Sequence, residues 1–354
     1  MEIMGQHVNQ LSVDRVDWID YAKGICIVWV VTLYATNFVQ EQTDSIGWMQ
    51  HAVNFARPFR MPDLFLLSGL FVGRVIRRPW RIYVDSKVLH FFYFYALWVS
   101  LKFVNQAGTG LFGADAASLL PDYLALYIQP PSGPLWFIYM LALFFVIVRL
   151  LRSVPKIFVM SAAIALEVPD IVTGIKIIDK FADYFVFFYT GYVFAPYVFR
   201  AAKWAESHLR SAGLILLLWF AANAALVEYG FSFQPGIELL MGYAGASAVM
   251  LLATLLCGVS WMSWLRYLGK NSIVVYLGFV VPLGLMRRFI ANPALNIDTG
   301  FLSLGVTIAS ILGAVLLYWV IRKTPLSFMY VRPEWLSFAK RRSFNIEEQP
   351  EGAV

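Results

Sequence analysis

Charged residues are scarce in this chain. Asp, Glu, Lys and Arg make up 14% of its 354 residues, whereas about a quarter of the residues of a typical soluble domain are charged. Hydrophobic residues make up 60%, and the mean hydropathy is +0.66. A water-soluble fold cannot bury that much apolar surface, so the composition excludes a soluble globular protein. It indicates a chain whose solvent is the lipid bilayer.

Cysteine is nearly absent as well. Cys26 and Cys257 both fall in apolar stretches, far apart in the chain and without the spacing of metal ligands. This pattern excludes a disulfide framework and gives no support to a zinc site, so we predict no metal and no bound cofactor. We expect both cysteines to be small buried hydrophobic side chains.

Apolar stretches recur along the whole chain, and a helix needs about 17–25 such residues to cross a hydrocarbon core of about 30 Å. Pro58, Pro62 and Pro282 interrupt or open two of these stretches, which we expect to be broken or tilted helices. The predicted fold class is therefore all-α, a polytopic membrane protein with about ten transmembrane helices. The predicted spans are approximately 18–39, 62–76 (led in by a helical segment from 47), 88–106, 134–151, 155–173, 180–200, 211–229, 236–258, 271–287 and 300–321.

Lys and Arg are unevenly distributed between the predicted loops, and positive charge is enriched on the cytoplasmic side of membrane proteins. The outer loop 107–133 has neither Lys nor Arg. This asymmetry predicts a cytoplasmic N-terminus and a cytoplasmic C-terminus. The net charge of +6 then reflects topology and attraction to anionic membrane lipids, and we expect no nucleic-acid partner. The Lys and Arg residues placed outside are Arg57, Arg60, Lys102, Lys176, Lys180, Arg287 and Arg288.

The chain divides into three parts by composition. Residues 1–17 are polar and form a predicted cytoplasmic segment; no small-residue cleavage pattern follows the first apolar span, so we expect that span to be retained. Residues 18–322 form the membrane domain. Residues 323–354 contain prolines, a basic run and acidic residues, which predicts a cytoplasmic, partly disordered tail.

Ionisable residues inside apolar spans are candidates for function, because each costs about 2.5–3.5 kcal/mol on insertion scales. The densest group contains Arg57, Arg60 and Asp63. The two arginines are three residues apart and would share a helix face, where they could bind one phosphate or carboxylate. The alternatives are an internal Arg–Asp pair that orients a broken helix, and snorkelling of the arginines to the outer headgroups.

The first span carries a second polar series. Asp17, Asp20 and Lys23 recur every three residues at its cytoplasmic end, where an Asp and the Lys can neutralise one another. Tyr34 lies eleven residues after Lys23, which is nearly the same helix face about 16 Å further along the axis. The two residues could line one channel, although on residue chemistry alone a packed aromatic is the more ordinary role for Tyr34.

Two helix starts also stand out. Pro130, Pro131 and Pro134 set a rigid entry to the fourth span, and Trp136 just inside it suits either an interfacial belt or a gate over an outer cavity. Asn271, at the cytoplasmic start of the ninth span, is a candidate helix cap.

Several of these stretches occur in an order that resembles the bacterial membrane acyltransferases of the acyltransferase-3 family. They are WIDYAKG at 18–24, FRMPDLFLLSG at 59–69, GPLWF at 133–137 and GKNSIVVY at 269–276. The resemblance covers roughly residues 14–322. It implies a ten-helix core and transfer of an acetyl or other acyl group from a cytoplasmic donor such as acyl-CoA to a glycan or lipid-linked sugar, often at the outer face.

The sequence departs from the family pattern at two positions. Many members have an Arg in the first helix followed, after ten intervening residues, by a His thought to be essential for transfer; Lys23 and Tyr34 occupy these positions here, and Arg60 replaces a second-helix His. Tyr is a weak base, because a phenol with a pKa near 10 is only about one part in a thousand ionised at pH 7. It can still hydrogen-bond a developing oxyanion.

The resulting hypothesis is an O-acyltransferase of the bacterial inner membrane. Its candidate catalytic residues are Tyr34 and Arg60, and its candidate substrate-binding residues are Lys23, Arg57, Asp63, Ser68 and Trp136. The expected partners are membrane lipids, acyl-CoA and a glycan or lipid-linked sugar acceptor. The alternative is a catalytically silent relative that binds or translocates an acylated or lipid-linked glycan.

Overall fold

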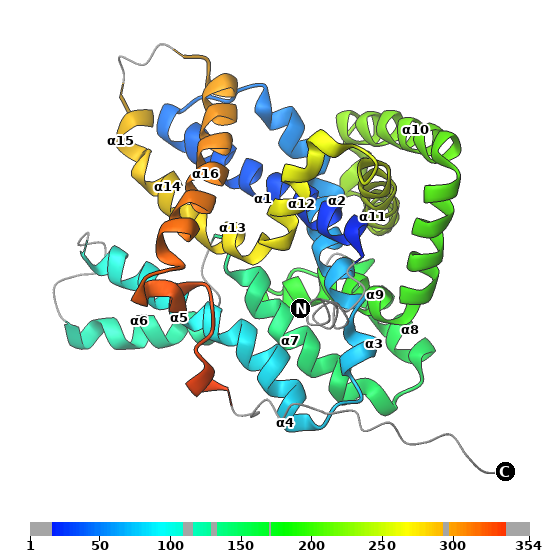
Figure 1. Ribbon diagram of the computed structural model, residues 1–354, viewed down its shortest axis with the longest axis horizontal. Coiled ribbons are helices and arrows are strands. Elements are labelled where there is room, and N and C mark those ends of the chain that lie inside the picture. The colour runs from blue at the N-terminus through cyan, green and yellow to red at the C-terminus, as the bar shows by residue number, and fades with distance from the viewer. Residues whose placement is uncertain (1–15, 109–115, 129–132, 170, 293–296, 338–354) are drawn as a thin grey trace, which may run out of the picture.

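The structure is a computed structural model that describes residues 16–108, 116–128, 133–169, 171–292 and 297–337. Every regular element among these residues is a helix, and the helices pack as one bundle (Figure 1). The all-α prediction is confirmed. The longer helices are α1 (Asp17–Thr43), α2 (Met49–Gly69), α5 (Leu89–Gly108), α7 (Trp136–Leu150), α8 (Lys156–Glu167), α9 (Lys176–Ser207), α10 (Leu209–Glu228), α11 (Ile237–Leu256) and α16 (Thr299–Ile321).

Shorter elements connect these helices. They are α3 (Val72–Val75), α4 (Trp80–Tyr83), α6 (Ala116–Ile128), α12 (Ser263–Lys270), α13 (Ser272–Gly278), α14 (Val280–Leu285) and α15 (Arg287–Ile290). Single turns are η1 (Val84–Val88, a π-helical turn), η2 (Leu151–Ser153), η3 (Phe231–Phe233), η4 (Ser260–Met262), η5 (Pro325–Met329) and η6 (Glu334–Leu336). Part of the predicted outer loop is therefore the helix α6.

The chain is a multi-pass membrane protein. Among the described residues, six helical stretches are long and apolar enough to cross a bilayer, and the bent pair Ser260–Lys270 and Ser272–Leu285 makes a seventh if it is one broken span. Each of the ten predicted spans has a helical counterpart, but α8 is too short and α2 and α9 are not apolar enough to meet the same criterion. The count of ten and the cytoplasmic termini therefore stay predictions.

Helix α1 lies at the centre of the bundle, where it packs against α2, α11, α12 and α16 (Figure 1). Small residues permit the closest of these contacts. A Cβ atom on Gly24 would overlap the carbonyl oxygen of Leu265, and one on Gly269 would overlap that of Asp20. Because helices in a bilayer gain no hydrophobic driving force from one another, such close backbone packing is a main source of their association.

The second predicted span, 62–76, is interrupted, but not at its prolines: α2 runs unbroken through Pro58 and Pro62, ends at Gly69, and α3 begins at Val72. A proline removes one backbone donor from the helix ladder, and neighbouring helices can supply replacements. Pro58 and Pro62 leave the carbonyls of Asn54 and Pro58 without their helical donors, and next to the first of these Asn223 of α10, almost fully buried, donates from Nδ2 to the carbonyl oxygen of Phe55 at 3.0 Å. A partner helix thus supports the proline-rich segment without a break.

The predicted cap at Asn271 is also wrong. Its side chain makes no cap hydrogen bond to α13, and Nδ2 instead donates to the carbonyl oxygen of Tyr267 at 3.0 Å in the preceding helix. The chain bends by 68° at this residue, before Pro282 is reached. Of the two cysteines expected to be buried, Cys26 is buried and Cys257 is exposed on the bundle surface.

The first part of the predicted tail packs on the bundle. Tyr93 of α5 donates from its hydroxyl to the carbonyl oxygen of Phe328 at 2.8 Å, and Tyr330 is buried. Arg332 forms an ion pair with Asp85 at 2.6 Å, with both side chains less than 10% exposed. The division of the chain into three parts stays a prediction; residues 338–354 lie outside the described part.

Candidate functional site

A cavity of about 500 Å³ opens between α1, α2, α9 and the start of α11. Its walls come from the second half of α1, the last residue of α8, residues 50–62 of α2, residues 180–187 of α9 and residues 235–238 at the start of α11. In the predicted orientation all of these helix ends lie on the outer side of the membrane. Charged side chains of both signs line it: Arg57, Arg60, Glu167, Lys180, Asp183 and Glu238.

Arg60 is the most unusual residue of the cavity wall. It is only 6% exposed, and its Nε and Nη1 atoms are buried without a hydrogen-bond partner among the described residues. A buried, unpaired charge is costly, and charges in proteins are normally paired when they leave water. Arg60 therefore places a buried positive charge with two unpaired N–H donors at the wall of the cavity, and this charge favours an anion, a carboxylate or a phosphate, as a ligand there.

Asp63 does not provide that anion. It is 1% exposed and its Oδ2 atom accepts from the Cys26 thiol at 3.8 Å, on the side of α2 that faces α1. The alternative of an internal Arg60–Asp63 pair is therefore wrong. Arg57 lines the same cavity as Arg60, as their three-residue spacing predicts, but it is exposed.

Lys180 supplies a third cation at the opposite wall. Its Nζ atom is 2.9 Å from Oδ2 of Asp183, and it lies 5.7 Å from the ring centroid of Trp136 and 5.4 Å from that of Tyr184. The Trp136 and Tyr184 rings are 5.5 Å apart. Trp136 thus points into the bundle beside the cavity, which agrees with the gate interpretation better than with an interfacial belt.

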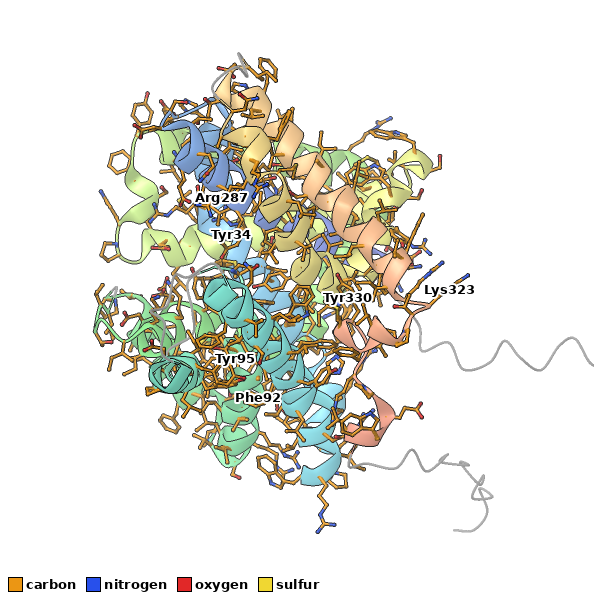
Figure 2. The ribbon with its side chains drawn as sticks, turned by 90° about the vertical axis from the view of Figure 1, so that its left-hand side faces the viewer. Tyr34, Phe92, Tyr95, Arg287, Lys323 and Tyr330 are labelled. Atoms are coloured by element: carbon orange, nitrogen blue, oxygen red, sulfur yellow. The ribbon has the colours of Figure 1, made fainter. Side chains whose placement is uncertain are left out.

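Tyr34 of α1, labelled in Figure 2, lies next to this group. It is half-buried, its ring packs 5.7 Å from that of Phe279, and the Trp136 indole lies near its hydroxyl. Arg60 and Lys180 are close enough to act on it electrostatically. The fold therefore brings Tyr34, Arg60 and Trp136, which are distant in sequence, to one site.

Like Asp63, two further predicted substrate-binding residues do not line the cavity. Ser68 donates to the carbonyl oxygen of Leu64 at 2.7 Å within its own helix. Lys23 lies half-buried near the other end of α1, with Nζ 5.7 Å from the ring centroid of Phe71. Neither residue lines the cavity.

Sequence reasoning missed the acidic half of the site. Glu167, Asp183 and Glu238 come from three different helices, and no shared motif connects them in the sequence. The sequence signal that could have identified them was their charge, because an acidic residue close to a membrane span is energetically costly and often functional. Among the described residues, no three His, Cys, Asp or Glu side chains lie close enough together to hold a metal ion.

These features define a helical membrane protein with a polar cavity. Acidic and basic side chains line the cavity, and a buried arginine and a tyrosine lie beside it. The chain belongs to the acyltransferase-3 family, whose description is "Acyltransferase domain" and which matches residues 16–319. It is 24% identical over 289 residues to the inner membrane protein YcfT of Escherichia coli (strain K12), covering 73% of this chain and 77% of the relative. No solved structure matches the chain.

The predicted family resemblance is thus confirmed, and so is the prediction of a multi-pass protein of the bacterial inner membrane. Family membership supports a membrane acyltransferase in general terms. The donor, the acceptor and the roles of the individual residues belong to the proposal that follows.

Proposed function

We propose that the protein is an O-acyltransferase that moves an acyl group, acetyl in the simplest case, from cytoplasmic acyl-CoA to a hydroxyl of a glycan or lipid-linked saccharide in the outer cavity. One observation carries the proposal. Arg60, in a chain of this family, is buried on the wall of a polar cavity with two unsatisfied donors, and Tyr34 lies beside it.

The reaction is a transesterification of a thioester. The acceptor hydroxyl oxygen attacks the thioester carbonyl carbon, the new C–O bond forms and the C–S bond breaks. The hydroxyl proton leaves the acceptor and ends on the departing CoA thiol. Negative charge develops on the carbonyl oxygen in between, so donors aimed at that oxygen accelerate the step.

The residues near the cavity can fill these roles. In the proposed reaction the Tyr34 hydroxyl, which lies near the Trp136 indole, donates to the developing oxyanion or passes the proton on. Arg60 holds an anionic group of the acceptor or the donor. The carboxylates of Glu167, Asp183 and Glu238 on the opposite wall are suited to accept hydrogen bonds from sugar hydroxyls.

Lys23 contributes to the binding of the acyl-CoA donor on the cytoplasmic side of the bundle. It precedes Tyr34 by eleven residues on α1, which places it about 16 Å nearer the cytoplasmic end. A donor bound there must therefore present its thioester on a long arm, and the pantetheine arm of CoA is such a group. The cationic ammonium suits the phosphates of CoA at the mouth of the bundle.

A second candidate function is binding or translocation of an acylated or lipid-linked glycan without chemistry. It is favoured by Tyr34 itself, which stands where the family pattern has His and whose ring packs against Phe279. A silent relative would retain the cavity and its charges but would lack an effective base.

Reconstitution separates the two candidates. Purified protein in liposomes receives radiolabelled acetyl-CoA and a glycan extract of the cell envelope, with protein-free liposomes and the Arg60→Ala variant as controls. The proposal expects label in the glycan fraction that mild alkali releases, as for an ester, and expects little with Arg60→Ala. Saturable glycan binding without any labelled product would favour the silent relative and contradict the enzyme.

A further inference from the structure

Tyr184 of α9 is a second phenol at the polar cavity. It lines the cavity, whereas Tyr34 does not. The two tyrosines are nevertheless close enough to interact electrostatically. A ligand in the cavity therefore meets Tyr184 first, although Tyr34 stands at the position where the family pattern has its His.

The hydroxyl of Tyr184 has no hydrogen-bond partner among the described residues. The hydroxyl of a tyrosine inside a protein usually finds one, and other tyrosines of the bundle follow this rule. Tyr83 donates to the carbonyl oxygen of Phe145 at 2.8 Å, and Tyr243 shares a hydrogen bond of 2.6 Å with Thr190. The Tyr184 hydroxyl is therefore available to a ligand in the cavity, both as a donor and as an acceptor.

Aromatic neighbours hold the ring of Tyr184 in place. The Phe65 ring is stacked on it, with centroids 5.3 Å apart and an interplanar angle of 25°, and the Trp136 ring lies 5.5 Å away. Phe65 itself is fully buried. A catalytic group works best when packing fixes its position, because the reacting atoms then need no further ordering. Tyr184 meets this condition.

Two cations act on Tyr184. Arg60 is an electrostatic neighbour of its phenol, and the Nζ atom of Lys180 lies 5.4 Å from its ring centroid. Such cations stabilise negative charge that develops on the phenol oxygen while a proton moves. A tyrosine is protonated at neutral pH, and the carboxylates of Asp183 and Glu238, which also act on Tyr184, oppose its ionisation between turnovers. The charge on the phenol is therefore transient.

We propose that Tyr184 is a catalytic residue that contacts the acceptor hydroxyl and passes its proton to Tyr34; this role rests on the proposed acyl transfer. As the acceptor oxygen attacks the thioester carbon, its proton moves to the Tyr184 oxygen, and the Tyr184 proton moves to the Tyr34 oxygen. The Tyr34 proton ends on the departing CoA sulfur. Each phenol gains one proton and loses one, so both are unchanged once the C–O bond has formed and the C–S bond has broken.

A relay of two phenols compensates for the weakness of tyrosine as a base. A single phenol is seldom ionised at neutral pH. A hydroxyl can, however, accept one proton while it donates another, so neither tyrosine has to be ionised beforehand. The chain can therefore move the acceptor proton without a His at the position of Tyr34.

Tyr184→Phe tests the relay, because it removes the hydroxyl and keeps the ring on Phe65. Tyr189→Phe on the same helix is the matched control, since Tyr189 is buried and does not line the cavity. We expect Tyr184→Phe to lower the single-turnover rate of acyl transfer by about 10²-fold. The control should transfer at the wild-type rate. A wild-type rate in Tyr184→Phe overturns the proposal.

Rates in mixtures of light and heavy water separate proton transfer from packing. We expect the wild-type rate to depend on the deuterium fraction along a curve, because several protons move together. Tyr184→Phe should show a clearly weaker curvature, and Tyr189→Phe should match the wild type. A slow Tyr184→Phe variant with the wild-type curvature indicates that the hydroxyl acts only through packing, and this result overturns the relay.

Fluorine NMR tests contact with the ligand without acyl transfer. 3-Fluorotyrosine is placed at position 184 or 189 of the full-length protein in detergent micelles, and the glycan extract of the cell envelope is added. We expect a saturable shift of the signal at position 184 and none at position 189. Equal shifts at both positions, or a shift at neither, overturn the proposal. A saturable shift at position 184 without acyl transfer by the wild type contradicts the proposed function alone.

Discussion

Arg60 and Asp63 lie one turn apart on α2, yet they do not pair: the carboxylate of Asp63 faces the Cys26 thiol, and two nitrogen atoms of Arg60 are buried at the cavity without a partner among the described residues. Two opposite charges with ideal helical spacing would normally neutralise one another. Their separation leaves the cation available to a ligand, which is the arrangement expected of a binding site rather than a structural pair.

Arg60→Ala is expected to reduce acyl transfer by about 10- to 100-fold or more, since a charge-assisted hydrogen bond contributes about 1.5–3 kcal/mol. The amount of folded protein should not fall, because Arg60 bonds no described side chain that the substitution would leave unpaired. Transfer in liposomes and thermal unfolding in detergent measure the two effects. Arg288→Ala, an exposed arginine outside the cavity, is the control and should behave as wild type. Wild-type transfer by Arg60→Ala contradicts the anion site.

Tyr34→Phe keeps the ring against Phe279 and removes the hydroxyl. If that hydroxyl donates a hydrogen bond or a proton during transfer, the rate should fall about 10²-fold or more with little change in stability. Tyr34→His restores the base of the family pattern and should raise transfer if the natural site is degenerate. Initial rates with labelled acetyl-CoA compare the three proteins. Unchanged transfer in both variants shows that Tyr34 has no chemical role.

Single-cysteine labelling tests the predicted orientation. In a Cys26→Ala, Cys257→Ala background, Asp122→Cys in the outer loop should react with an impermeant maleimide in intact cells, whereas Asn345→Cys in the tail should react only after permeabilisation. The expectation follows from the distribution of Lys and Arg between the two sides. Labelling of position 345 in intact cells contradicts both the topology and the charge argument.

The ion pair between Arg332 and Asp85 should stabilise the docked tail. Both side chains are buried, so Arg332→Ala leaves a buried carboxylate and should cost up to about 3–5 kcal/mol. The pair between Arg266 and Asp17 has a similar N–O distance of 2.9 Å but is 38% and 47% exposed, so Arg266→Ala should cost about 1 kcal/mol or less.

Unfolding midpoints in detergent and limited proteolysis after residue 325 measure these costs. We expect a lower midpoint and faster tail cleavage for Arg332→Ala only, with partial recovery in the Arg332→Gln, Asp85→Asn double variant. Identical cleavage rates in Arg332→Ala and Arg266→Ala indicate that the buried pair does not hold the tail.

The two arginines of the cavity wall were predictable from local sequence. The three-residue spacing placed Arg57 and Arg60 on one helix face, and both line one cavity. The acidic wall was not predictable, because Glu167 and Glu238 approach α2 only through helix packing. The hydrogen-bond partner of Asp63 was not predictable from the residues around it either, because that partner, Cys26, comes from another helix.

The sequence by itself determined that this protein is an all-helical, multi-pass membrane protein of the acyltransferase-3 family. Hydrophobicity over about 20 residues is a local property, and a membrane helix satisfies its own backbone hydrogen bonds whatever its neighbours are. Only the tertiary structure decided which charges meet. Glycines at 24, 69, 191 and 269 allow the helices to approach closely and so set their mutual positions. That packing leaves Arg60 facing a polar cavity on one side of α2 and Phe59 facing an apolar groove on the other.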